Sequence, residues 1–317
     1  MFDPVVYHVS MDGSGPGDGD VLEMGPEKPP RTWAIGGRTR RVLIAAGVCV
    51  LLAVGGTVAA VRLSAPSPAA QALARLVTEV TTVPAGVAVP ATAAVSDGGY
   101  YYESSSSSST SAYSSALSIN FPFPTPVSGP PLTADGKPEV LYVANEYCPY
   151  CVAENWSLIV ALSRFGQFTG LSTSRSPAFA NIAPIDGWTF SGSSYTSPYL
   201  AFVPVENRSN VLVRPEADPA YATSYRVRQK LTPAQQAVFG TFDSLGQTPF
   251  LDFGGKATML GSTVSPPVLA GSSWSTIAAG LRRPESPADM AIIAGAHTLT
   301  AEFCQLTHDR PAAACRP

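Results

Sequence analysis

The sequence predicts an α/β fold in which a central mixed sheet is flanked by helices. Three observations carry this prediction. The apolar run 139–145 has the length of a strand, and a CxxC motif at 148–151 follows it directly at the start of a helical pattern. Further along, the apolar runs 249–254 and 257–260 are separated by glycine, as in a β-hairpin. A helical pattern over 274–281 comes next, with one apolar face.

The elements between the CxxC motif and the hairpin are expected in the following order. The first helix covers about 148–165, and residues 168–172 form a second strand. Residues 199–204 form an added strand near a sheet edge, because prolines flank or interrupt it. Thr232 and Pro233 begin a further helix, since threonine is a good N-cap and proline suits the first helical position. The chain therefore holds an insertion between the CxxC helix and the hairpin.

The amino-acid composition differs between segments of the 317-residue chain and suggests where its domains begin and end. Residues 1–41 are expected to form a disordered cytoplasmic tail, because their first part is acidic and has no helical or strand period. Residues 64–137 are rich in serine, alanine and proline and are expected to be a disordered, low-complexity linker, with at most a short helix over residues 71–80. The folded domain is then 138–317. Only 14% of residues are charged and the net charge is −3, so no nucleic acid partner is expected.

One transmembrane helix is predicted over residues 42–63. The run 42–61 holds 20 uncharged residues, and a helix of that length covers roughly 30 Å, the thickness of a bilayer core. Basic residues crowd its N-terminal side, so the N-terminus is expected in the cytoplasm and the folded domain outside the cell membrane. A cleavable signal peptide is the alternative, although the run and the segment before it are longer than usual.

The CxxC motif is the part of the sequence that predicts a chemical activity. A cysteine at the first turn of a helix lies beside unpaired N–H groups and the positive end of the dipole, which stabilise its thiolate. Cys148 is therefore the expected nucleophile and Cys151 the resolving thiol one turn along. Pro149 fits the first turn, where its missing N–H is not needed. Tyr150 is expected at the exposed rim, where it contributes to substrate binding.

The order of strand, CxxC helix, strand, Thr-Pro-strand, strand and helix resembles the thioredoxin fold. In that fold a cis-proline precedes the third core strand and lies against the CxxC pair, and Pro249 stands at the matching place. The resemblance implies that the Thr248–Pro249 bond is cis and that Thr248 presents its backbone to a substrate. The alternative is that Pro249 simply begins a strand.

A wider pattern is more specific. It comprises Asn145–Cys151, Glu154, Trp156, residues 161–166, residues 195–199, Glu206 and Pro249–Phe250. It resembles the domain-of-unknown-function family 929 over about residues 138–283. The resemblance implies a membrane-anchored protein with a thioredoxin-like fold and a dithiol site, and it implies no substrate.

Glu154 and the C-terminal cysteines leave alternatives open. Glu154 is either a proton-transfer group for Cys151 or a solvated acid favoured by the helix dipole. Cys304 and Cys315 are expected beyond the last helix, joined by a disulfide that holds the C-terminal tail. An electron relay to the CxxC pair is a second interpretation. A metal site that also uses His297 and His308 is a third, although the spacing matches no compact zinc module.

These observations favour a membrane-anchored, extracytoplasmic thiol-disulfide oxidoreductase. Its expected partners are cysteine-containing exported or membrane proteins, a membrane redox partner that recharges the dithiol, and the lipid bilayer through residues 42–63. No cofactor and no metal are expected. The first alternative is a non-enzymatic thioredoxin-like binding module that keeps Cys148 and Cys151 as a structural disulfide. A metal-binding protein that uses the CxxC thiolates is the second.

Overall fold

The structure, a computed structural model, describes residues 66–89, 93–96, 99–102, 123–179, 182–219, 221–243 and 246–316. The predicted cytoplasmic tail and transmembrane helix, residues 1–63, lie outside the described residues. Within the described ranges, no helix combines the length and the apolar character needed to cross a bilayer.

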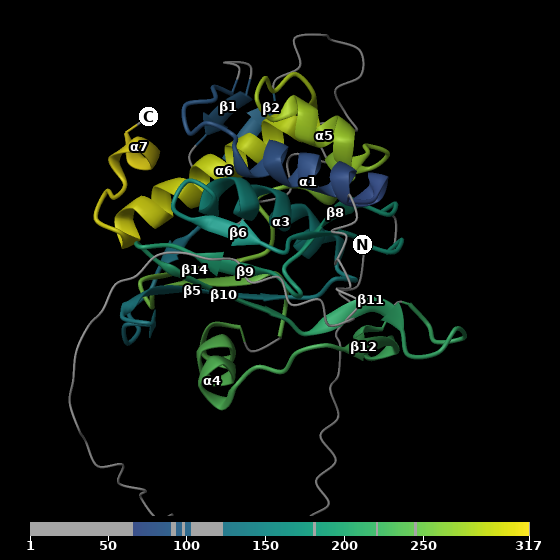
Figure 1. Ribbon diagram of the computed structural model, residues 1–317. Helices are drawn as coiled ribbons and strands as arrows, with labels where there is room; N and C mark the ends of the chain where they lie inside the picture. Colours follow the sequence, from purple (N-terminus) through teal and green to yellow (C-terminus); the bar gives the residue numbers. More distant parts are fainter. Residues whose placement is uncertain are drawn as a thin grey trace, which may run out of the picture. The chain divides into compact units, whose positions relative to one another are not determined.

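A mixed sheet of six strands forms the centre of the described fold (Figure 1). The strand order is β10-β5-β13-β14-β3, and β4 also pairs with β5. Strand β10 runs parallel to β5, whereas the β5–β13, β13–β14 and β14–β3 pairs are antiparallel. The strands of this sheet are β3 (Thr125–Pro126), β4 (Thr133–Ala134), β5 (Lys137–Ala144), β10 (Ala201–Glu206), β13 (Phe250–Phe253) and β14 (Ala257–Leu260).

Four further strand pairs lie outside this sheet: β1 with β2, β6 with β9, β7 with β8, and β11 with β12. Their strands are β1 (Ala93–Ser96), β2 (Gly99–Tyr102), β6 (Gln167–Thr169), β7 (Ser172–Arg175), β8 (Asp186–Thr189), β9 (Ser194–Thr196), β11 (Arg208–Leu212) and β12 (Tyr225–Val227). The helices are α1 (Pro68–Thr81), α3 (Pro149–Leu162), η1 (Ala222–Ser224), α4 (Pro233–Phe242), η2 (Pro266–Leu269), α5 (Trp274–Gly280), α6 (Pro287–Leu306) and α7 (Ala312–Cys315).

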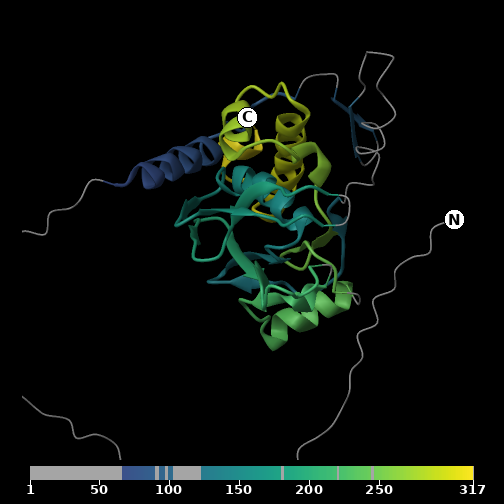
Figure 2. The same cartoon turned by 90° about the vertical axis from the view of Figure 1, so that its right-hand side faces the viewer.

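Helices cover both faces of the sheet (Figures 1 and 2). Successive side chains of a strand point to opposite faces, and β5 follows this rule. Val140 and Tyr142 join the larger apolar core, which includes α3, α5 and α6. Leu141 and Val143 join a smaller core with Phe239 of α4. Strand β5 is therefore buried on both sides, and it delivers the chain to the start of α3.

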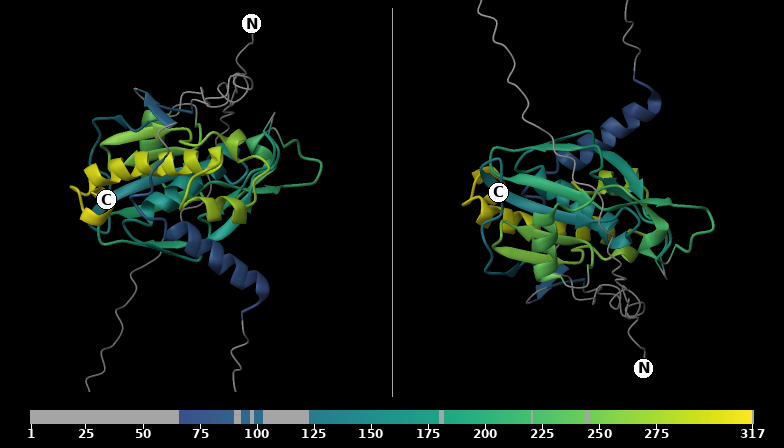
Figure 3. Two further views of the ribbon diagram at one scale, coloured as in Figure 1. Left: turned by 90° about the horizontal axis from the view of Figure 1, so that it is seen from above. Right: turned by 90° about the horizontal axis from the view of Figure 1, so that it is seen from below.

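Helix α6 lies along α3, as the view from above shows (Figure 3). The two helices approach closely at Gly295, where a Cβ atom would overlap the hydroxyl groups of Thr263 and Ser157. Ser157 also donates a hydrogen bond from Oγ to the Ile292 carbonyl, 3.1 Å away. This contact holds α3 between the sheet and α6, so almost every α3 side chain is buried.

The structure confirms a mixed α/β fold with helices around a central sheet, and it corrects two expectations about the elements. The predicted strand at 168–172 is wrong as a core strand, because β6 and β7 occupy this region and pair with β9 and β8. The strand beside β5 is β10, which lies at an edge of the sheet and confirms the edge strand predicted for residues 199–204. Cys304 was expected beyond the last helix but lies within α6.

The expected disordered linker over 64–137 is wrong for residues 66–89 and 123–137. Helix α1 begins with Ser67 as its N-cap and packs against α3 and α5 through one apolar face, on which Val80 is fully buried. At the other end of the range, β3 pairs with β14, and Val127 donates a hydrogen bond to the Lys256 carbonyl at 2.8 Å. Apolar side chains spaced at helical intervals, though few, supply enough burial to order α1.

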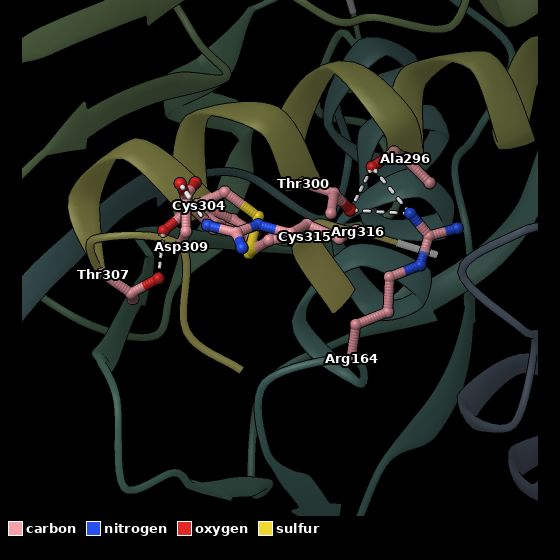
Figure 4. The surroundings of a disulfide bond; sticks show 9 residues. Arg164, Ala296, Thr300, Cys304, Thr307, Asp309, Cys315 and Arg316 are labelled. Atoms are coloured by element: carbon pink, nitrogen blue, oxygen red, sulfur yellow. Dashed lines mark hydrogen bonds and ion pairs between the residues drawn. A yellow bond between two sulfur atoms is a disulfide. The ribbon is translucent and has the colours of Figure 1, made fainter. Parts of the chain in front are cut away.

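A disulfide joins Cys304 of α6 to Cys315 of α7 (Figure 4). The chain between them turns back on itself, and the Asp309 amide donates a hydrogen bond to the Cys304 carbonyl at 2.8 Å. Beside the disulfide, Arg164 donates a hydrogen bond to Thr300 Oγ1 at 2.7 Å and so links the end of α3 to α6. The C-terminal segment is thereby attached to the helical layer.

Removal of this disulfide is expected to destabilise the protein. The Cys304→Ala/Cys315→Ala variant should lose about 3 kcal/mol of unfolding free energy, since the bridge restricts the unfolded chain over a separation of 11 residues. Urea unfolding of the two proteins measures the difference, and dithiothreitol should destabilise the wild type more than the variant. Equal urea midpoints for variant and wild type would contradict the prediction.

Candidate functional site

The CxxC motif lies where strand β5 ends and helix α3 begins. Cys148 is the N-cap of α3, with φ −81° and ψ 118°, and Pro149 takes the first helical position. The first N–H groups of a helix have no partner within it, so they point toward a sulfur at the N-cap. The structure therefore places Cys148 at the positive end of a helix whose remaining side chains anchor it in the core.

The two cysteines occupy different environments, and both thiols are free. Cys148 is half-buried, whereas Cys151 is 1% exposed. A hydrogen bond from the Cys151 thiol, together with the backbone N–H groups of Cys151 and Tyr150, lowers the pKa of Cys148. Burial, and then the neighbouring Cys148, raise the pKa of Cys151. The first sulfur is thus the one that ionises first and reaches solvent.

The Thr248–Pro249 segment lies against the motif, and its peptide bond is cis, which confirms the prediction. The Cys148 thiol donates to the Thr248 carbonyl at 3.6 Å. Tyr150 is half-buried beside the pair and contributes its backbone N–H to Cys148. Cys148, Cys151, Thr248 and Pro249, which lie far apart in the sequence, therefore form one site.

Asn145 connects the parts of this site, although the sequence places it only in the family pattern and assigns it no role. Its backbone N–H donates to Cys151 Sγ at 3.4 Å, and its side-chain Nδ2 donates to Thr248 Oγ1 at 3.0 Å. It is the residue that follows β5, so the strand fixes its position. An asparagine before a helix has many ordinary roles, and only the folded structure shows which partners it reaches.

Glu154 is fully buried, so the interpretation as a solvated first-turn acid is wrong. Its Oε2 atom accepts hydrogen bonds from Thr263 N at 2.6 Å, Thr263 Oγ1 at 2.8 Å and Ser262 Oγ at 3.1 Å. Burial outweighs these bonds and raises the pKa of Glu154 to about 7. Its hydrogen bonds within the described residues go to Ser262 and Thr263, and none goes to a cysteine.

Two further carboxyl groups, those of Glu146 and Glu206, are buried close to the CxxC motif. Thr189 Oγ1 is 2.7 Å from Glu146 Oε1 and 2.5 Å from Glu206 Oε2. A hydroxyl has one hydrogen to donate, so one of these carboxyl groups must carry a proton for both contacts to be hydrogen bonds. Burial raises the pKa of Glu206, whereas Glu146 forms an ion pair with Arg228 at 3.0 Å. Glu206 also accepts hydrogen bonds from the backbone N–H groups of Phe190 at 3.1 Å and Ser191 at 2.8 Å.

Aromatic side chains pack around the motif. The Tyr147 ring stacks on Tyr225 of β12, with ring centres 4.4 Å apart and planes inclined by 5°. Tyr142 lies beneath the motif, and its hydroxyl donates to Asn155 Oδ1 at 2.7 Å. Tyr195 donates to the Leu162 carbonyl at 2.8 Å, at the far end of α3. Tyr147 therefore connects the site to the β11–β12 hairpin, and Tyr195 has a structural role.

Sequence reasoning also missed Thr189 and Arg228, which reach the site from the insertion. Nothing in the sequence around them indicates which carboxylate they meet, because each comes from a separate hairpin. In the part of the chain that the structure describes, no three histidine, cysteine, aspartate or glutamate residues gather as a metal-binding group.

Comparison with known proteins gives one finding. The family model described as Domain of unknown function (DUF929) matches residues 124–305. No curated protein and no solved structure matches the chain. The matched range includes β5, the CxxC motif, the cis-proline and most of α6. It covers more than half of the chain, and the chain therefore belongs to the family Domain of unknown function (DUF929).

Proposed function

We propose that the protein is a thiol-disulfide oxidoreductase with Cys148 as nucleophile and Cys151 as resolving thiol. The observation that carries the proposal is the placement of Cys148 at the N-terminus of α3, where its pKa is lowered while that of Cys151 is raised. A lowered pKa supplies the thiolate that attacks a disulfide near neutral pH.

The reaction proceeds in two exchanges. The Cys148 thiolate attacks a disulfide of the client protein, a mixed disulfide forms, and one client sulfur leaves as a thiolate that takes up a proton. Cys151 then loses its proton and attacks the Cys148 sulfur, which releases the second client sulfur. The client has gained two electrons, and the protein holds a Cys148–Cys151 disulfide. The reverse sequence oxidises a client dithiol.

A thioredoxin-like arrangement supports this reaction. The strand order β10-β5-β13-β14, with β10 parallel to β5 and the other two pairs antiparallel, resembles the core sheet of that fold. The cis peptide bond before Pro249 adds to the agreement. In this arrangement the backbone of Thr248 is the surface against which a client segment pairs.

Glu154 is the proposed proton carrier for Cys151. The pKa of its carboxyl group, raised to about 7, allows it to take up and release a proton near neutral pH. It lies one helical turn past Cys151 on α3. Glu154 forms hydrogen bonds with Ser262 and Thr263 and none with Cys151. Its role in proton transfer is therefore tested by the pH dependence of the rate at which Cys151 attacks the mixed disulfide.

We place the reaction outside the cell membrane, on a protein anchored through residues 42–63. The charge asymmetry around the apolar run supports this orientation, and the Cys304–Cys315 disulfide agrees with a non-reducing compartment. The clients are then cysteine-containing exported or membrane proteins. A membrane redox partner that exchanges electrons with the Cys148–Cys151 pair completes the cycle.

The full chain in detergent, assayed for reduction of insulin disulfides with dithiothreitol as electron source, tests the proposal. The wild type should accelerate the reaction, and Cys148→Ala should abolish the acceleration. Cys304→Ala/Cys315→Ala is the matched control, because it also removes cysteines but leaves the dithiol intact. A wild type no faster than Cys148→Ala would exclude the enzyme and favour the binding-module alternative.

Asn145→Ala is expected to slow the same reaction by about tenfold, because the variant loses the bond that positions Thr248 beside the cysteines. The backbone bond from residue 145 to Cys151 Sγ is retained, so the two thiols should keep their order of ionisation. Urea unfolding checks that the variant is folded. An unchanged rate in a folded variant would show that the side chain of Asn145 does not position the site.

A further inference from the structure

Exposed apolar side chains gather on one hairpin beside the site. Five large apolar residues are exposed among the described residues, and four of them lie on or next to strands β11 and β12: Val211, Val213, Tyr221 and Val227. Each is between 45% and 55% exposed. We call residues 208–230 the β11–β12 arm; residue 220 in its loop lies outside the described residues. Figures 1 and 3 show the arm at one side of the sheet, with its loop directed outward.

The arm is also basic. Residues 208–230 hold five arginine or lysine residues and two acidic ones, although the whole chain has a net charge of −3. Arg226, Arg228 and Lys230 are exposed on or just after β12. Exposed apolar and cationic side chains therefore alternate along the arm, a composition that suits a segment that is both apolar and acidic.

The arm is fixed to the residues that precede Cys148. The Glu146 backbone N–H donates to the Arg208 carbonyl at 2.9 Å, and the Glu146 carboxylate pairs with Arg228 at 3.0 Å. Tyr147 stacks on Tyr225, as described above. A cavity of about 280 Å³ opens at this junction and is lined in part by Glu146 and Arg228. A segment bound to the arm is thus held at a defined place relative to the nucleophile.

Strand β12 offers a backbone edge as well as side chains. It pairs with β11, and no other described strand lies on its second side. An extended segment can add to such an edge through main-chain hydrogen bonds, while alternate side chains contact the surface. The arm therefore favours an extended chain over a folded helix.

We propose that the β11–β12 arm is a docking surface for an extended, apolar and acidic segment of the client protein that Cys148 attacks. This inference rests on the proposed function and narrows its substrate class. The segment lies along β12, its acidic side chains meet Arg226 and Lys230, and its neighbouring cysteine is brought to the CxxC motif.

Binding of short, fluorescent, cysteine-free peptides to the full chain in detergent tests the docking surface apart from the redox reaction. A peptide that alternates valine and glutamate should bind, and its affinity should fall as salt is added, because salt screens exposed charges. The matched peptide that alternates valine and lysine should bind at least about tenfold more weakly, a difference of about 1.4 kcal/mol. Equal binding of the two peptides would overturn the proposal.

Two variants locate the binding. Val211→Thr/Val213→Thr/Val227→Thr keeps the branched side chains that suit strands but removes apolar contact, and its affinity for the acidic peptide should be about tenfold lower than that of the wild type. The affinity of Arg226→Glu/Lys230→Glu for this peptide should fall at least as much. The control Arg75→Glu/Arg283→Glu makes the same change of charge on α1 and after α5, and should bind as the wild type does. Wild-type affinity in both arm variants would contradict the proposal.

Redox assays then separate this inference from the proposed function. With a disulfide-containing acidic peptide, the arm variants should raise KM and leave the reduction of a small disulfide unchanged. If Cys148→Ser binds the cysteine-free peptide normally but the wild type catalyses no exchange, the docking surface stands and the oxidoreductase fails. If exchange proceeds with the same KM in arm variants and wild type, the docking surface fails and the oxidoreductase stands.

Discussion

Cys151→Ala is expected to turn the protein into a trap for its clients. Without the resolving thiol, the mixed disulfide between Cys148 and the client has no sulfur to release it, so the covalent complex should accumulate. Because removal of Cys151 also removes the largest cause of the lowered pKa of Cys148, capture should be slower than the first exchange of the wild type. The complex should appear on non-reducing gels and disappear after reduction.

The control experiment identifies which cysteine forms the mixed disulfide with the client. Cys148→Ala should capture nothing, since Cys151 is buried and its pKa is raised. Mass spectrometry of the trapped complex should find the client joined to residue 148. Capture by Cys148→Ala at the same level, or clients joined through residue 304 or 315, would contradict the assigned roles.

Glu154→Gln is expected to remove a pH dependence of stability. The pKa of Glu154 is raised in the folded protein from 4.5 to about 7, so the folded state holds a proton that the unfolded state releases. The stabilisation is complete below about pH 4.5 and is lost as the pH rises through about 7. A shift of this size corresponds to about 3 kcal/mol. The wild type should therefore become less stable relative to Glu154→Gln across this window.

Urea unfolding of both proteins at several pH values measures the effect as a difference, which cancels the other titrating groups. Glu285→Gln, at an exposed glutamate, is the matched control and should show no such trend. A wild-type stability that runs parallel to that of Glu154→Gln at every pH would show that Glu154 does not hold a proton when folded.

The parts of the site that the sequence predicts are those encoded by local patterns. The apolar run before Cys148 predicts β5 and the start of α3, and the runs around the glycines at 254 and 255 predict the β13–β14 hairpin. Thr232 and Pro233 predict α4, and the structure shows the full capping box with Gln235. In each case neighbouring residues determine the element, whatever packs against it later.

The parts that sequence reasoning missed depend on tertiary contacts or on weak signals. Helix α6 has a clear N-terminal capping box formed by Ser286 and Asp289, but small residues such as Gly295 obscure its apolar period. Only the structure shows why a small residue stands at 295, because α3 lies close against α6 there. For α1 the sequence indicates only a short helix over residues 71–80, because the segment is of low complexity; the full helix is stabilised by packing on α3 and α5. The meeting of Thr189 with Glu146 and Glu206 depends on the fold of the insertion, which pairs separate hairpins.

The most direct test of the central claim is the pH dependence of alkylation of the reduced wild type, with each cysteine followed by mass spectrometry. Cys148 should react first, with a midpoint below the usual thiol pKa of about 8.5, and Cys151 should stay protected. In Cys151→Ala the midpoint of Cys148 should rise, because the hydrogen bond that lowers its pKa most is lost. A wild-type midpoint for Cys148 at or above about 8.5, or faster alkylation of Cys151, would contradict the account.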